Sequence, residues 1–68
     1  MNKNLLKSKM ALWGHTNSDL AEVVGCSPQR FSAKLNESQG AEFTQGEIQK
    51  IKEVYDLTND EVTEIFFN

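Results

Sequence analysis

The feature that most constrains the fold of this chain is the stretch from Thr16 to Asn36, which reads TNSDLAEVVGCSPQRFSAKLN. Its first part is a helical pattern that begins after Thr16, whose hydroxyl can accept a hydrogen bond from a backbone N–H of the first turn. Asp19 stands three residues later and completes a capping box with Thr16. Gly25 falls where a helix should end with a positive φ, which a residue without a Cβ adopts at little cost. The pattern therefore predicts a helix over about residues 17–24.

A second helical pattern follows after a tight turn. Ser27 is a preferred N-cap, and Pro28 suits the first helical position because its missing N–H is not needed there. Phe31 and Leu35 are four residues apart and share one face, which must turn back onto the first helix. We therefore expect a helix from Pro28 to about Leu35. Together the two patterns predict a helix-turn-helix unit over about residues 16–36, whose second helix can enter the major groove of DNA.

The rest of the chain predicts three further helices. An apolar stripe at helical spacing runs through residues 2–13, and two more capping boxes open helices near residues 45 and 59. Residues 36–43 are rich in turn formers and predict a loop. The two boxes pair Thr44 with Glu47 and Thr58 with Glu61. Residues 1–68 therefore predict one all-α domain of five short helices, without a strand.

Six positions, aligned on Gly25, carry a resemblance to a known class of DNA-binding domain. They are Asn17, Leu20, Ala21, Gly25, Ser27 and Phe31. On these positions the chain resembles the helix-turn-helix domains of the lambda-repressor-like class, which includes Cro-type and small phage regulators. Family members often carry Gln where this chain has Asn17. They also often carry an apolar residue where it has Lys34, and here that residue comes one position later, at Leu35.

The motif covers about a third of the chain, and the flanking sequence agrees with it. The run KLNESQGAEFTQGEI and the Phe66-Phe67 pair look like small regulators from phages of Gram-positive bacteria. The resemblance therefore implies a lambda-repressor-like fold and a role in phage or prophage transcription regulation.

The candidate DNA contacts lie on the side of the second helix opposite Phe31 and Leu35. Amide side chains can pair with adenine N6 and N7, small apolar groups can meet a thymine methyl, and hydroxyls can donate or accept. The expected base-facing residues are Ser27, Pro28, Gln29, Ser32, Ala33 and Asn36. Arg30 and Lys34 are expected at the flanks, toward phosphates, and the resemblance places Asn17 at a phosphate near a positive helix end. The alternative is that all of these are ordinary solvent-facing residues.

The net charge of −3 is unusual for a DNA-binding protein, but the charges are unevenly distributed. Residues 1–34 hold five basic and two acidic side chains, net +3, whereas residues 35–68 hold two basic and eight acidic ones, net −6. The acidic half can orient the protein on DNA, repel DNA weakly, or receive a basic protein partner. It can equally be a solvated surface.

Several other functions are not expected. The chain has no apolar run long enough for a transmembrane helix and no signal-peptide pattern, and its single Cys26 suits a reducing cytoplasm as a small core filler. His15 has no companion ligands, so no metal is expected. No nucleophile–base pair or Gly-rich phosphate loop is present, so neither an enzyme nor a cofactor is expected. Trp13 is expected in the core or half-buried at a helix end.

Two functions remain. The first is a transcriptional regulator that binds a double-stranded DNA operator, as a possible homodimer or together with a partner. The second is a modulator that docks on a co-encoded phage repressor and alters its DNA binding. The carboxylate-free face of the second helix favours the first. Net acidity and the absence of a separate dimerisation domain favour the second.

Overall fold

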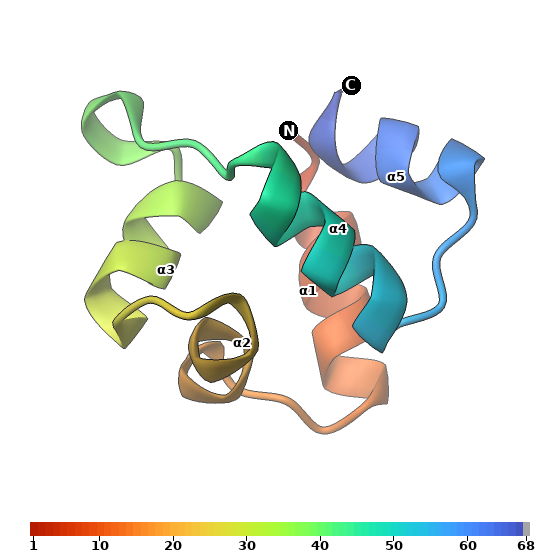
Figure 1. Ribbon diagram of the computed structural model, residues 1–68, viewed down its shortest axis with the longest axis horizontal. Coiled ribbons are helices and arrows are strands. Elements are labelled where there is room, and N and C mark those ends of the chain that lie inside the picture. Colours follow the sequence, from red (N-terminus) through yellow and green to blue (C-terminus); the bar gives the residue numbers. More distant parts are fainter. Residues whose placement is uncertain (68) are drawn as a thin grey trace.

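The computed structural model describes residues 1–67, which form five α-helices and one short 3-10 turn and contain no strand (Figure 1). The helices are α1 (Lys3–Leu12), α2 (Asn17–Val24), α3 (Pro28–Leu35), α4 (Gln45–Val54) and α5 (Asn59–Phe66), and the turn η1 is Ser38–Gly40. The predicted all-α architecture of five short helices is thus confirmed for these residues.

The helix ends follow the capping residues. At the start of α2 the Thr16 hydroxyl accepts from the Asp19 N–H, while the Asp19 carboxylate accepts from the Thr16 N–H at 2.8 Å. The same reciprocal bonds open α4 and α5, so all three predicted capping boxes are confirmed. Gly25 ends α2 with φ of 83°, and Ser27 caps α3 by accepting from the Arg30 N–H at 3.2 Å. Local sequence therefore sets where these helices begin and end.

The helices bury one shared core. In Figure 1, α4 lies centrally, with α3 on one side and α5 on the other. α2 packs against both α3 and α4, and α5 packs against α1 and α4. Every helix contributes a fully buried side chain: Leu6, Leu20, Phe31, Leu35, Ile51 and Ile65. The Cα radius of gyration of 10.7 Å matches the value of about 11 Å expected for a compact chain of this length.

Two segments have features that the sequence did not predict. The loop over residues 36–43 contains the turn η1, and in it Glu37 and Gln39 adopt left-handed backbone conformations with φ of 55° and 53°. Trp13 follows the last residue of α1 and is 55% exposed, so it is not a core residue but lies partly buried at the helix end, the second of the two positions expected for it. Its ring lies against the rings of His15 and Tyr55, at centroid distances of 6.3 and 5.8 Å.

His15 joins the α1–α2 link to the end of α4. Its Nδ1 shares a hydrogen bond of 2.8 Å with the Tyr55 hydroxyl, and its backbone N–H donates to the Met10 carbonyl. Burial, and to a smaller extent the negative charge of Asp19, raises the pKa of Tyr55 to about 12. His15 therefore has a structural partner in the core.

The single tyrosine makes this burial measurable. Because the folded-state pKa lies above the value of about 10 for a free phenol, the contribution of Tyr55 to stability is fully present below pH 10. It is lost as the pH rises toward 12. We expect phenolate absorbance to titrate near pH 12 in the folded protein and near pH 10 in concentrated urea. Coincident curves would contradict a buried Tyr55.

Candidate nucleic-acid interface

The outer face of α3 carries most of the residues that sequence assigned to DNA. It consists of Ser27, Pro28, Gln29, Arg30, Ser32, Ala33 and Asn36, of which Ser32 and Ala33 are half-buried and the others exposed. Phe31 and Leu35 lie buried on the opposite side, as predicted. α3 itself lies at one edge of the molecule, next to the η1 turn (Figure 1). This face is therefore accessible, polar and without a carboxylate.

The N-terminal part of the outer face has free hydrogen-bonding groups. Within residues 1–67 the Gln29 side chain makes no hydrogen bond, so its amide oxygen and nitrogen are both available. A glutamine in this state can pair with the N6 and N7 atoms of adenine. Ser27 uses its oxygen as the cap of α3 and keeps its own O–H to donate. Arg30 forms no ion pair with any described residue.

The C-terminal part of the outer face forms hydrogen bonds with a side chain from another helix, which the sequence did not predict. Lys3, from the first turn of α1, donates to Asn36 Oδ1 at 3.1 Å. Asn36 Nδ2 donates to Ser32 Oγ at 3.5 Å, so both ends of the Asn36 amide have partners. To form hydrogen bonds with an adenine, the Asn36 amide has to break its hydrogen bonds with Lys3 and Ser32. Lys3 is 33 residues away in sequence, and no local signal predicts the contact.

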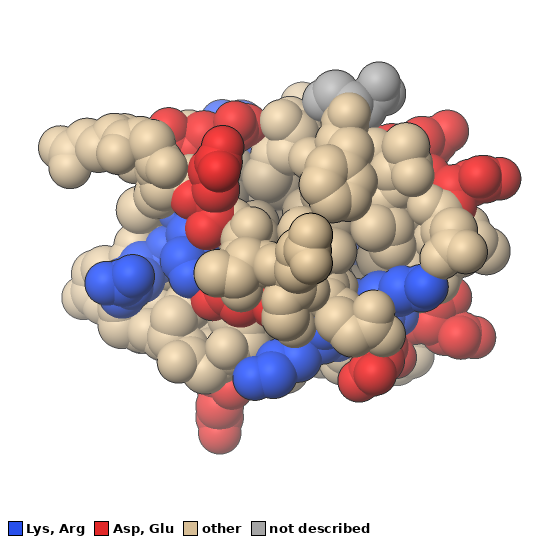
Figure 2. Space-filling model, turned by 45° about the horizontal axis from the view of Figure 1, so that its top comes forward, with Lys and Arg blue, Asp and Glu red and all other residues tan. Residues whose placement is uncertain are grey.

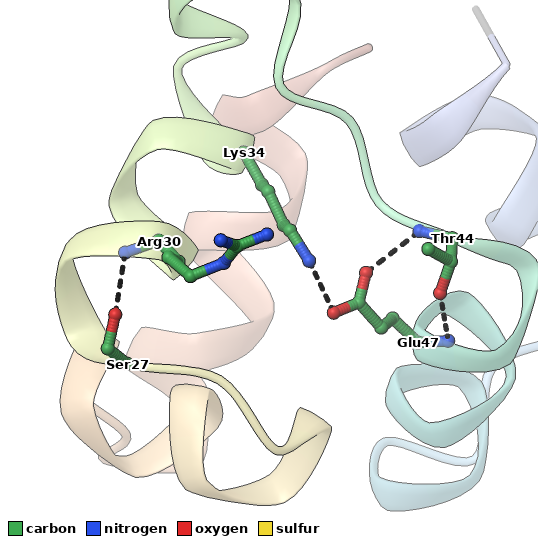
Figure 3. Close-up of polar contacts among 5 residues, drawn as sticks. All are labelled: Ser27, Arg30, Lys34, Thr44 and Glu47. Carbon is green, nitrogen blue, oxygen red and sulfur yellow. Dashed lines mark hydrogen bonds and ion pairs between the residues drawn. The ribbon is translucent and has the colours of Figure 1, made fainter.

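Lys34 is not at the outer flank of α3, where it was expected to meet a phosphate. Its side chain is buried, and its ammonium donates to Glu47 Oε2 at 2.5 Å, across to the start of α4 (Figure 3). The other Glu47 oxygen accepts from the Thr44 N–H at 2.8 Å. Burial raises the pKa of Glu47, but the hydrogen bonds from Lys34 and Thr44 outweigh it and hold this pKa below its usual value. The Glu47 carboxyl group is therefore ionised at neutral pH.

The position of Lys34 has a simple cause. It follows Phe31 by three residues and precedes Leu35, so it belongs to the inward stripe of α3. The aliphatic stem can pack beside apolar neighbours, but a buried ammonium requires a partner, which Glu47 supplies. The sequence alone could have indicated this inward position, because Lys34 stands where members of the class that the chain resembles often carry an apolar residue.

Asn17 is the first residue of α2 and is exposed. The N-terminus beside it already holds the carboxylate of Asp19, whose pKa is lowered by hydrogen bonds from the backbone and then the hydroxyl of Thr16. This carboxylate balances the positive end of the helix dipole. A phosphate at this position would therefore depend on the Asn17 side chain itself.

The two halves of opposite charge are partly paired in space. Lys9 donates to Glu61 at 2.6 Å and Lys34 to Glu47, so two lysines of the basic half are held by carboxylates of the acidic half. Hydrogen bonds from Lys9, and then from Thr58, lower the pKa of Glu61. Figure 2 shows a face with both signs of charge, acidic groups gathering toward the edge where α5 lies. The basic half thus presents fewer free cations than its composition suggests.

Two shallow grooves adjoin α3. One, of about 230 Å³, lies between α3 and the η1 region and is lined by Arg30, Ala33, Lys34, Ser38, Gln39 and Ala41. The other, of about 170 Å³, includes three phenylalanines in its lining, which consists of Met1, Lys34, Glu37, Glu42, Phe43, Ile48, Phe66 and Phe67. Lys34 is the residue that the two grooves share.

Within residues 1–67, no three or more His, Cys, Asp or Glu side chains are grouped in a way that could hold a metal ion. No helix in this part of the chain has the length and apolar character needed to cross a membrane.

Comparisons with known proteins give no family assignment: no protein-family model, no curated protein and no solved structure matches this chain.

Proposed function

We propose that this protein is a transcriptional regulator of phage or prophage type that binds duplex DNA. In this proposal α2 and α3 form a helix-turn-helix, and the outer face of α3 enters the major groove. The observation that carries it is the polar, carboxylate-free outer face, with Gln29 unengaged at its exposed end. Such a protein works in the bacterial cytoplasm, and its fold would be of the lambda-repressor-like kind.

The cations beside the outer face support weak, position-setting contacts with phosphates. Arg30 is exposed on the face, and the Lys3 ammonium lies within hydrogen-bond distance of Asn36. If each of these two cations neutralises one phosphate, a plot of the logarithm of the binding constant against the logarithm of the salt concentration has a slope of about −1.8 per monomer. A single α3 covers one half-site, so we expect two copies, or one copy with a partner, on a complete operator.

A second candidate function is a modulator that docks on a co-encoded phage repressor. It is favoured by the net charge of −3 together with the ion pairs of Lys9 and Lys34, which leave few cations for DNA. A basic surface on the repressor would be attracted by the carboxylates of the second half of the chain.

Selection from a pool of random duplexes tests the DNA proposal without knowledge of the operator. We expect enrichment of one short sequence, and tighter binding of that sequence than of scrambled duplex in an anisotropy titration. The same titrations with the co-encoded repressor added examine the second function. No enrichment, combined with a protein that binds only the repressor, would overturn the DNA proposal in favour of the modulator.

A further inference from the structure

The Lys34–Glu47 pair lies directly behind the outer face of α3. Lys34 is the residue after Ala33, which belongs to that face, and its charge is directed inward by a carboxylate on α4 (Figure 3). The two side chains are 10% and 13% exposed, so the pair is shielded from water and salt. The ammonium of Lys34 is thus held on the inner side of α3, one residue along the chain from a member of the outer face.

An alternative position for this ammonium is open. The groove of about 230 Å³ between α3 and η1 is lined by Lys34 together with Arg30 and Ala33, two members of the outer face. A lysine side chain has rotatable bonds throughout its stem, so its ammonium can leave the pair and turn into this groove. From there it would lie beside Arg30, where the phosphate backbone passes in the proposed complex.

We infer that Glu47 withholds Lys34 from DNA and so limits the part of the affinity that does not depend on base sequence. This inference rests on the proposed DNA-binding function. Phosphate contacts strengthen binding to every sequence alike, whereas base contacts distinguish the operator. Holding Lys34 inward keeps α3 anchored to α4 and keeps one cation away from non-specific DNA.

The physical basis is the cost of an unpaired buried charge. With Glu47 neutral, the ammonium of Lys34 is left in a shielded place without a counter-charge, which favours its movement to water or to a phosphate. A Glu47→Gln substitution removes the charge and keeps a side-chain oxygen that can accept from the Thr44 N–H. The start of α4 is therefore retained in the variant that releases Lys34.

The chain supplies a matched control. Glu61 has the same arrangement as Glu47: one oxygen accepts from the Thr58 N–H inside a capping box and the other from a lysine, Lys9. α5, which carries Glu61, lies on the far side of α4 from α3 (Figure 1). Glu61→Gln changes the net charge by the same amount as Glu47→Gln and releases a lysine away from the outer face.

The experiment measures the salt dependence of binding to random duplex for the full-length parent and four variants. These are Glu47→Gln, Lys34→Met, the double variant of both, and Glu61→Gln. Glu47→Gln should steepen the log–log slope by about 0.9 and tighten binding about eightfold at 0.1 M salt. Lys34→Met and Glu61→Gln should keep the parent slope. The double variant should return to it, because its released cation is gone. Circular dichroism melts establish that each variant is folded at the assay temperature.

Three results would overturn the inference. Lys34→Met alone flattening the slope by about 0.9 would mean that Lys34 already contacts a phosphate in the parent. An unchanged slope in a folded Glu47→Gln would mean that the released ammonium finds another carboxylate, such as Glu42 in the neighbouring groove. If Glu47→Gln does not fold, the slope of Lys34→Met still decides. If the unmodified parent protein binds no DNA, the proposed function is overturned, and this inference with it.

Discussion

A Phe31→Ala variant should have a free energy of unfolding about 3–5 kcal/mol below that of the parent protein. Phe31 is fully buried, and its ring meets the edge of the Phe43 ring at a centroid distance of 5.5 Å. Removing it leaves a cavity under α3, where Leu35 is the other fully buried apolar side chain of that helix. Since small domains are stable by only about 5–15 kcal/mol, this is a large share of the total. Urea unfolding followed by circular dichroism measures it.

Phe67→Ala is the matched control, because it deletes the same side chain at a place that is 67% exposed. A change within about 0.5 kcal/mol is expected there. If both variants unfold at the same urea concentration as the parent, Phe31 does not fill the space between α3 and the core, and the packing described here is wrong.

The starts of α2, α3, α4 and α5 and the end of α2 were predictable because each depends on chemistry within four residues. Thr16 needs only Asp19 to form its box, and Gly25 needs only its missing Cβ to adopt a positive φ of 83°. Thr44 and Thr58 repeat the arrangement of Thr16. The inward positions of Phe31 and Leu35 followed from helical spacing alone. Interactions between residues this close in sequence can be inferred from the sequence itself, so five helices could be predicted.

The charged contacts of the candidate interface could not be predicted in the same way. Lys3 reaches Asn36 only because the fold brings the first turn of α1 beside the end of α3. Lys34 belongs to the inward stripe of α3, but only the fold brings its partner, Glu47 of another helix, within hydrogen-bond distance. Both contacts depend on how helices distant in sequence pack together. A helical face shows which residues can be exposed, but the direction of a long charged side chain depends on its tertiary partners.

Trp13 illustrates the same limit for an apolar residue. Spacing placed it on the inward stripe of the first helix, yet α1 ends at Leu12 and Trp13 lies in the turn that follows. Its ring covers His15 and Tyr55 from outside and remains 55% exposed. The helix ended one residue earlier than the apolar pattern suggested, and one residue of a helix is a rotation of about 100°.

Gln29→Ala should weaken binding to the selected operator by about 1–3 kcal/mol and leave binding to random duplex almost unchanged. Gln29 is exposed on the first turn of α3, and its amide makes no hydrogen bond within residues 1–67. Its removal therefore loses base-edge contacts without leaving a buried group unpaired in the free protein. Anisotropy titrations of both duplexes at one fixed salt concentration measure the two effects.

Gln49→Ala provides the comparison for Gln29→Ala, since Gln49 is an exposed glutamine on α4 whose side chain donates to Glu53 of the same helix. It should bind both duplexes as the parent does. On the modulator alternative, Gln29→Ala would instead weaken capture of the co-encoded repressor and change neither DNA titration. Equal weakening on operator and random duplex would assign Gln29 to the phosphate backbone. If the parent itself binds the two duplexes equally, no base readout exists for Gln29 to supply, and the proposed regulator is excluded in favour of a protein-binding role for the same outer face.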